Sequence, residues 1–249
     1  MDAYIETVRF NVALTCASST LNRSTDIGRQ KERTLHAALK YYLEPDDAFH
    51  EVRTGRYIAD IHKDGSITEI QTRQFHMLRS KLAAFLAEYN VTVVFPVAQT
   101  KWLSWVDDTT GETTKKRKSP KTGQPLEVMA ELYKLGDIIG HPNFSLRIIM
   151  LGIHEYRCLN GWSADKKKGS HRLERIPEGI YSEILLQNPN DYMRLLPADL
   201  PEIFTVSDLS KKARVTPRLA QTALLVLYRM GAVCRNGRIG RKYAYSLPE

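Results

Sequence analysis

The sequence has few cysteines and no long apolar run, and each shortage excludes a class of protein. The three cysteines among the 249 residues, Cys16, Cys158 and Cys234, are not spaced as metal ligands. They indicate reduced thiols rather than a disulfide framework. No apolar stretch reaches the roughly 18–20 residues that span a bilayer, and no basic segment precedes the mild run at 10–17. We therefore expect a cytoplasmic protein with no membrane partner.

The sequence also lacks a glycine-rich phosphate loop and has a deficit of acidic residues. Gly136 and Gly140 do not have P-loop spacing, so nucleotide hydrolysis is not indicated. No Ser/His/Asp or Cys/His motif is present. Lysine and arginine total 36 against 28 aspartates and glutamates, a formal net charge of +8. An excess of positive charge favours a polyanionic partner, above all where the charge is concentrated locally.

The apolar pattern predicts an α/β protein with a mixed sheet. Residues 1–26 lack clear periodicity and are expected to form a loosely ordered leader. A helix over 27–43, strands at 49–53, 57–62 and 66–71, a helix over 73–89 and a buried strand at 91–95 follow. The order α-β-β-β-α-β predicts a mixed sheet flanked by helices.

Further along we expect a helix near 126–135, a strand at 145–152, and a pair of strands around the loop 166–169. Pro197 and Pro201 separate this domain, 27–196, from a second one at 197–249.

The second domain reads as helix, turn, helix and β-hairpin. A short helix over 207–213 and a turn at Arg214 precede Thr216, an N-cap residue, and Pro217, at the first helical position. The second helix runs over 217–230, and strands at 232–235 and 242–246 follow. This order resembles a winged helix-turn-helix. Residues 205–245 contain nine lysines and arginines but only one acidic residue, Asp208. This excess of positive charge predicts DNA binding. The expected DNA contacts are Arg214, Arg218, Arg235, Arg238, Arg241 and Lys242. The alternative is a module that contacts protein or serves as a rigid cap.

A second basic segment lies in the first domain. Lys115, Lys116, Arg117, Lys118 and Lys121 place five positive charges within seven residues. We expect them to contact DNA phosphates, with Trp102 and Trp105 fixing the base of the loop. A solvated, mobile loop is the alternative.

Two carboxylates are expected to face each other across a hairpin. Asp64 and Gly65 form a two-residue turn signal. Counting outward from that turn places Asp60 opposite Glu69, and period two places Gln71 on the face of Glu69. Two opposed carboxylates repel, and a divalent cation between them relieves the repulsion. Glu32 shares a helical stripe with Leu35, His36 and Leu39 and is expected to point toward the sheet.

This layout resembles the PD-(D/E)XK nuclease superfamily, in its Holliday-junction-resolvase and restriction-endonuclease branches. The matching stretches are 28–33, 57–60 and 68–71. The strings 35–40 and 69–72 also resemble a group of uncharacterised bacterial proteins over most of residues 27–247, a resemblance that implies no function.

The nuclease resemblance implies a Mg²⁺- or Mn²⁺-dependent DNA endonuclease or resolvase. Asp60 and Glu69 would bind the metal and Glu32 would touch it, with these three and Gln71 as the catalytic set. Gln71 stands where the superfamily usually has lysine. Lys81, Arg79, Arg73 or Lys40 are candidates to supply the missing positive charge. Cutting both strands takes two sites, so a homodimer is a further expectation.

Two alternatives stand beside this interpretation. One is a catalytically inactive nuclease fold that binds DNA as a regulator, and the other is a subunit of a larger assembly. Asp60 could instead pair with His62 or Arg56, and Glu69 with Arg73. His36 and His62 are expected to be structural, with a proton shuttle as the alternative role.

Overall fold

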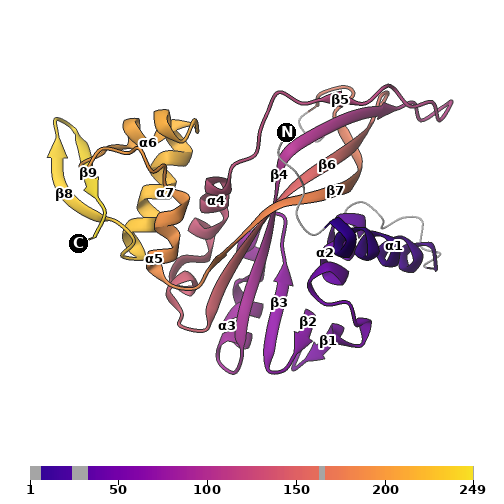
Figure 1. Ribbon diagram of the computed structural model, residues 1–249, viewed down its shortest axis with the longest axis horizontal. Coiled ribbons are helices and arrows are strands. Elements are labelled where there is room, and N and C mark those ends of the chain that lie inside the picture. The colour runs from indigo at the N-terminus through magenta and orange to yellow at the C-terminus, as the bar shows by residue number, and fades with distance from the viewer. Residues whose placement is uncertain (1–6, 24–32, 163–165, 249) are drawn as a thin grey trace. The chain divides into compact units, whose positions relative to one another are not determined.

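The computed structural model describes residues 7–23, 33–162 and 166–248, and it is an α/β protein (Figure 1). Its helices are α1 (Thr7–Arg23), α2 (Arg33–Leu43), α3 (Arg79–Leu86), α4 (Met129–Leu132), α5 (Pro189–Tyr192), α6 (Val206–Lys212) and α7 (Pro217–Arg229). Short 3₁₀ segments are η1 (Asp47–Phe49), η2 (Phe75–Leu78), η3 (Pro125–Val128), η4 (Tyr133–Gly140) and η5 (Met193–Leu195). Its strands are β1 (His50–Thr54), β2 (Tyr57–Lys63), β3 (Ser66–Ile70), β4 (Asn90–Val106), β5 (Arg117–Lys118), β6 (Phe144–Cys158), β7 (His171–Leu186), β8 (Cys234–Ile239) and β9 (Lys242–Ser246).

The main sheet is mixed, as the sequence predicts. Its strands are hydrogen-bonded in the order β1-β2-β3-β4-β6-β7, with β5 added to β4. β1 pairs antiparallel with β2, whereas β3 pairs parallel with β4. The turn between β2 and β3 has Asp64 at φ 49° and Gly65 at φ 71°. Two positive φ angles in a two-residue connection are the signature of a type I′ hairpin, so the expected turn is confirmed.

The chain divides into two compact units. The first comprises Met1–Lys63, Pro96–Gln124 and Ile149–Glu183, and the second comprises Asp64–Phe95, Pro125–Ile148 and Ile184–Glu249. None of the helices in the described ranges is long and apolar enough to cross a bilayer.

The first unit corrects one expectation. Residues 7–23 of the expected loose leader form α1, which packs beside α2 (indigo in Figure 1). Phe10, Ala13 and Ala17 are buried on one face of α1 at helical spacing, and Phe10 meets Tyr42 edge to face at 5.8 Å. Two of these three residues are alanines, and small side chains give a weak apolar signal in the sequence.

The second unit is built on the parallel pair β3–β4. Its register runs from Ser66 opposite Asn90 to Ile70 opposite Val94. A parallel connection must return along the sheet, and η2 and α3 make that return. Leu82, Phe85 and Leu86 on α3 are buried, which is why this segment forms a helix with one apolar face.

The C-terminal module, residues 204–246 of the second unit, contains α6, α7 and the β8–β9 pair (yellow in Figure 1). Thr205 and Asp208 form a capping box at the start of α6. Thr216 caps α7 by accepting from the Leu219 amide, with Pro217 at the first helical position, as expected. The first strand begins at Cys234 rather than at 232, because the Ala232 amide donates back to the Leu227 carbonyl at the end of α7.

Phe10→Ala tests whether α1 is docked. We expect the free energy of unfolding to fall by about 3 kcal/mol, because a buried phenylalanine would be replaced by a cavity. Val8→Ala is the matched control on the same helix: Val8 is 80% exposed, and its truncation should change stability by less than about 0.5 kcal/mol. Equal urea-unfolding midpoints for the two variants would show that α1 is not part of the fold.

Candidate functional site

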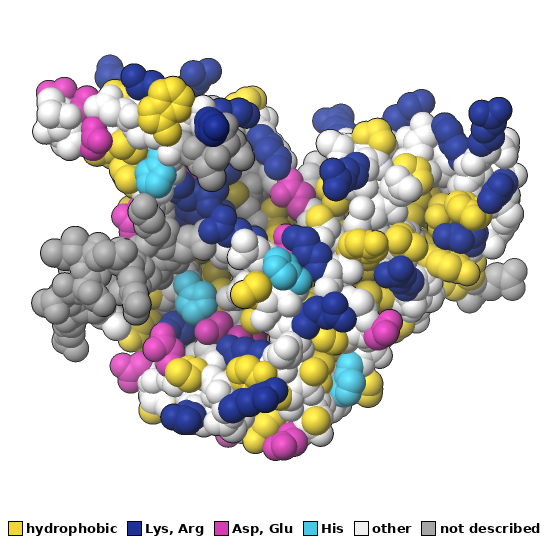
Figure 2. Space-filling view, turned by 180° about the vertical axis from the view of Figure 1, so that it is seen from behind, with side chains coloured by type: hydrophobic (Ala, Val, Ile, Leu, Met, Phe, Trp, Pro, Cys, Tyr) yellow, Lys and Arg dark blue, Asp and Glu magenta, His cyan; other side chains and the backbone are white. Residues whose placement is uncertain are grey.

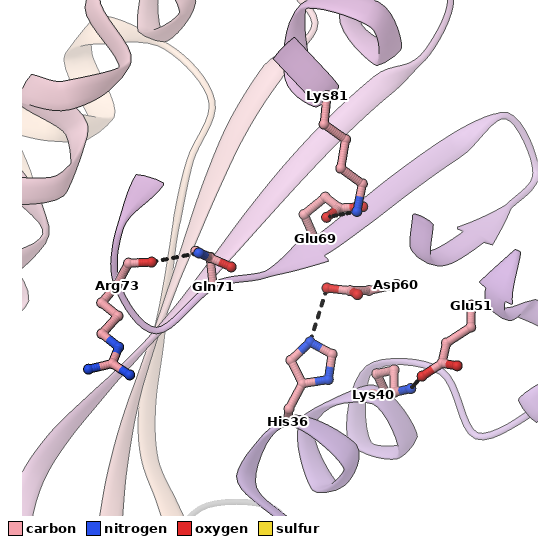
Figure 3. Close-up of polar contacts among 8 residues, drawn as sticks. All are labelled: His36, Lys40, Glu51, Asp60, Glu69, Gln71, Arg73 and Lys81. Carbon is pink, nitrogen blue, oxygen red and sulfur yellow. Dashed lines mark hydrogen bonds and ion pairs between the residues drawn. The ribbon is translucent and has the colours of Figure 1, made fainter. Parts of the chain in front are cut away.

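Asp60 lies in the first unit beside His36. β2 carries Asp60, α2 carries His36, and the imidazole Nε2 lies 3.1 Å from Asp60 Oδ2 (Figure 3). Both side chains are part-buried. The other candidate histidine, His62, meets the Thr54 hydroxyl through Nδ1 at 2.9 Å. Asp60 is therefore paired with a histidine, His36, from α2.

A second ion pair lies close to Asp60. Lys40, one turn after His36 on α2, donates to Glu51 Oε1 at 2.6 Å, and its side chain is 11% exposed. The Lys40 hydrogen bond and charge hold the pKa of Glu51 below its usual value, although burial and the neighbouring Asp60 carboxylate act to raise it. Lys40 is thus already engaged by Glu51. We refer to His36, Lys40, Glu51 and Asp60 as the Asp60 cluster.

Glu69 lies in the second unit and is almost fully buried. It shares a face of β3 with Ile67, which is also buried. Lys81 on α3 places its ammonium 2.5 Å from Glu69 Oε2, and the two side chains are 18% and 3% exposed (Figure 3). α3 therefore supplies one of the lysines that the sequence offered as the missing cation. Arg73, another of those candidates and an expected partner of Glu69, lies in the turn after β3.

Gln71 follows the end of β3. Its backbone amide donates to the Val94 carbonyl at 2.9 Å, which extends the parallel pairing by one residue. Its carboxamide Nε2 donates to the Arg73 carbonyl at 2.5 Å (Figure 3). This side chain thus stabilises the turn that leads into η2.

The implied metal would need several oxygen or nitrogen ligands close together. Glu32, the expected third ligand, lies outside the described residues. Within 7–23, 33–162 and 166–248, no three His, Cys, Asp or Glu side chains are grouped closely enough to hold a metal ion. The described donors therefore do not form a complete metal site on their own.

The basic segment of the first unit is partly ordered by its neighbours. Lys116 forms an ion pair with Glu178 and lies 4.9 Å from the centre of the Trp102 ring. Arg117 and Lys118 form β5 and are exposed, and Lys115 and Lys121 are exposed as well. Trp102 thus contacts this segment as expected. Trp105 also holds the base of the segment, because its backbone exchanges hydrogen bonds with Thr114 at 2.8 and 2.9 Å. Its indole N–H donates to the Gly169 carbonyl at 2.6 Å and anchors a second loop.

The C-terminal module contains a groove of about 810 Å³. It is lined by residues from α6, the start and outer face of α7, and the β8–β9 pair: Val206, Ser207, Ser210, Lys211, Pro217, Gln221, Leu225, Arg235, Arg241, Lys242, Tyr243 and Tyr245. Three of the expected DNA contacts, Arg235, Arg241 and Lys242, lie in this lining. The sequence reasoning missed the groove residues Gln221 and Tyr243. The alternation of Tyr243 and Tyr245 along β9 was the available signal.

The other expected contacts in this module, Arg214, Arg218 and Arg238, are not among the residues that line the groove. Arg214 occupies the turn between α6 and α7 with φ 52°, and Arg218 is exposed in the first turn of α7. Arg238 donates to the Tyr243 hydroxyl at 3.2 Å. The Arg235 guanidinium lies 4.0 Å from the Tyr243 ring centre and 4.4 Å from that of Tyr228. Arg235 therefore packs the β8–β9 pair against α7, a role that its charge alone did not predict.

Lys81→Met isolates the buried pair on β3. We expect the free energy of unfolding to fall by about 3 kcal/mol at pH 7, because Glu69 would lose the ammonium in contact with its buried carboxylate. The double variant Lys81→Met/Glu69→Gln should recover most of that loss. Lys134→Met is the control, since Lys134 pairs with Glu131 at a surface position. This substitution should lower the free energy of unfolding by less than about 1 kcal/mol. Additive losses in the double variant would contradict the coupling.

Comparison with known proteins places these features in a family. The model for "Domain of unknown function (DUF8091)" matches residues 33–187. An uncharacterised protein of Treponema pallidum (strain Nichols) is 29% identical over 216 residues, which cover 86% of this chain and 85% of that protein. No solved structure matches the chain. The matched segment includes α2, the whole main sheet and both carboxylate positions, and the chain belongs to the DUF8091 family.

Proposed function

We propose that the protein binds double-stranded DNA through its C-terminal module, and that this module is a winged helix-turn-helix. The observation that carries the proposal is the groove between α6, α7 and the β8–β9 pair, whose lining includes Lys211, Arg241 and Lys242. Lysine and arginine side chains gather on the surface of this module, with few acidic ones among them (Figure 2).

The chemistry of the lining favours a nucleic acid. Lysine and arginine contacts to phosphates supply most of the affinity of DNA-binding proteins. Arg218 and Gln221, one turn apart in the first part of α7, are side chains that can read base edges in the major groove. Thr216 and Pro217 start α7 sharply, so its N-terminal turn is held in a defined position beside the groove.

The double variant Arg241→Gln/Lys242→Gln tests the DNA interface. In fluorescence anisotropy with a labelled duplex, we expect weaker binding and a salt dependence that is shallower by about 1.8, since each lost phosphate contact removes about 0.9 from the slope. Lys134→Gln removes one positive charge at a residue outside the groove lining, and it should leave the salt dependence of DNA binding unchanged. Unchanged binding in the double variant would contradict the proposal. Absence of DNA binding by the wild type, together with copurification of a protein partner, would favour the assembly alternative.

Metal-dependent phosphodiester hydrolysis by a PD-(D/E)XK-like domain is a second candidate function. The ion pair between Lys81 and Glu69 favours hydrolysis. Position 71, where the superfamily usually has a lysine, is a glutamine here, and Lys81 supplies a positive charge beside Glu69 instead. His36 would hold the Asp60 carboxylate in orientation.

The competing possibility is an inactive nuclease fold that acts as a DNA-binding scaffold. Lys81 already neutralises Glu69, so a divalent cation would have to share that carboxylate with an ammonium. Gln71 donates within its own turn and supplies no charge. Cleavage itself distinguishes the two functions.

Cleavage is tested with Mg²⁺ or Mn²⁺ on linear, supercoiled, single-stranded and branched DNA. If the second candidate holds, the wild type cuts at least one substrate, whereas Asp60→Ala/Glu69→Ala binds DNA with unchanged affinity and does not cut. The reason is that the two carboxylates would take part in the cleavage step, whereas the C-terminal module would supply the affinity for DNA. If the wild type and the double variant both bind DNA and neither cuts it, DNA binding is left as the function.

A further inference from the structure

A cluster of charged side chains in the first unit lies outside everything described so far. Adjacent strands β4, β6 and β7 carry Lys101, Glu155 with Arg157, and Arg172. β6 lies between the other two strands, so Glu155 has cationic neighbours on both sides. We call Lys101, Glu155, Arg157, Arg172 and the nearby Arg175 the Glu155 cluster.

The two carboxylate oxygens of Glu155 have different surroundings. Arg157 donates to Oε1 through Nε at 2.8 Å and approaches the same oxygen through Nη2 at 2.7 Å. Near Oε2 lie the Arg172 Nε at 3.3 Å and the Lys101 ammonium at 3.6 Å. Charge-assisted hydrogen bonds are about 2.7–2.9 Å long, so Glu155 draws these last two cations close without a full hydrogen bond to either.

Cations outnumber the carboxylate in the contacts of Glu155. One carboxylate faces Lys101, Arg157 and Arg172, and the charge of Arg175 also acts on Lys101. Burial, and then Arg175, Arg172 and Arg157, lower the pKa of Lys101, whereas Glu155 raises it. Burial alone would raise the pKa of Glu155, but Lys101, Arg172 and Arg157 bring it below its ordinary value. Lys101 and Arg157 alone carry more positive charge than Glu155 carries negative charge, so the arrangement favours a further negative charge. Arg172 and Arg175 have additional interactions within the chain.

The cluster is also open on one side. Glu155 is 1% exposed, whereas the side chains of Lys101, Arg157 and Arg172 are 22%, 25% and 38% exposed. A buried carboxylate thus holds three cationic groups whose outer sides reach solvent. Arginine has five N–H donors and lysine has three, so Lys101 and Arg157 keep donors beyond their contacts with Glu155.

We propose that the Glu155 cluster binds a phosphate group, with Lys101 and Arg157 as its ligands and Glu155 as the positioning residue. Phosphate accepts several hydrogen bonds at once, and guanidinium groups match it in a bidentate manner. Glu155 fixes the cations before the ligand arrives, which reduces the ordering cost of binding. The phosphate belongs either to a nucleic-acid backbone or to a free phosphorylated molecule. The inference does not rest on cleavage or on the C-terminal groove.

The test is titration calorimetry with inorganic phosphate at constant ionic strength. We expect Lys101→Met to weaken binding about tenfold, the effect of losing one charge-assisted contact. Lys101→Arg should retain binding, because it keeps the charge, and the control Lys134→Met should titrate like the wild type. Without phosphate, Lys101→Met should unfold at an equal or higher urea concentration, since a desolvated charge has been removed.

A DNA duplex without terminal phosphates, titrated in parallel, identifies the source of the phosphate group. Weaker binding of Lys101→Met to the duplex supports a nucleic-acid backbone, and an effect confined to inorganic phosphate supports a free phosphorylated molecule. Identical titrations of wild type and Lys101→Met with both probes would overturn the proposal. A lower unfolding midpoint of Lys101→Met with unchanged titrations would show that the cluster is only a structural ion-pair network.

Discussion

Parallel strands cannot be joined by a tight turn, because the chain must return along the full length of the first strand before the second begins. Between β3 and β4 that return is made by η2 and α3, and the buried face of α3 covers the pair. The same return brings Lys81 onto Glu69. The parallel pairing therefore determines both the core of the second unit and the neighbour of its most deeply buried carboxylate.

Local patterns in the sequence predicted those elements whose formation depends on a few neighbouring residues. The α2 stripe, the hairpin turn at Asp64 and Gly65, and the cap of α7 at Thr216 each depend on a few adjacent residues, and the structure contains all three. α1 was missed because alanines supply most of its buried face. The run of β-branched and aromatic residues before Pro96 predicts a strand at 91–95, but β4 continues to Val106 and pairs with β5 at Trp102 and Leu103.

Contacts between distant residues were beyond the sequence. Lys101, Glu155 and Arg172 are separated by 54 and 17 positions and share no motif, so only the order β4-β6-β7 brings them together. The pairing of Asp60 with His36 depends likewise on how α2 lies against β2. Lys81 was one of four candidate cations, and the sequence alone could not choose among them. The positive charge of the chain is thus divided between residues that neutralise buried carboxylates and residues left at surfaces.

The cysteines offer a practical consequence. Cys158 is buried and Cys16 is half-buried, whereas Cys234 is exposed at the start of β8. The next residue, Arg235, lines the groove of the C-terminal module. A thiol-reactive dye applied to the folded chain would attach first at Cys234, because access governs labelling there. The native sequence therefore already carries an attachment point for a fluorescent reporter at the edge of that groove.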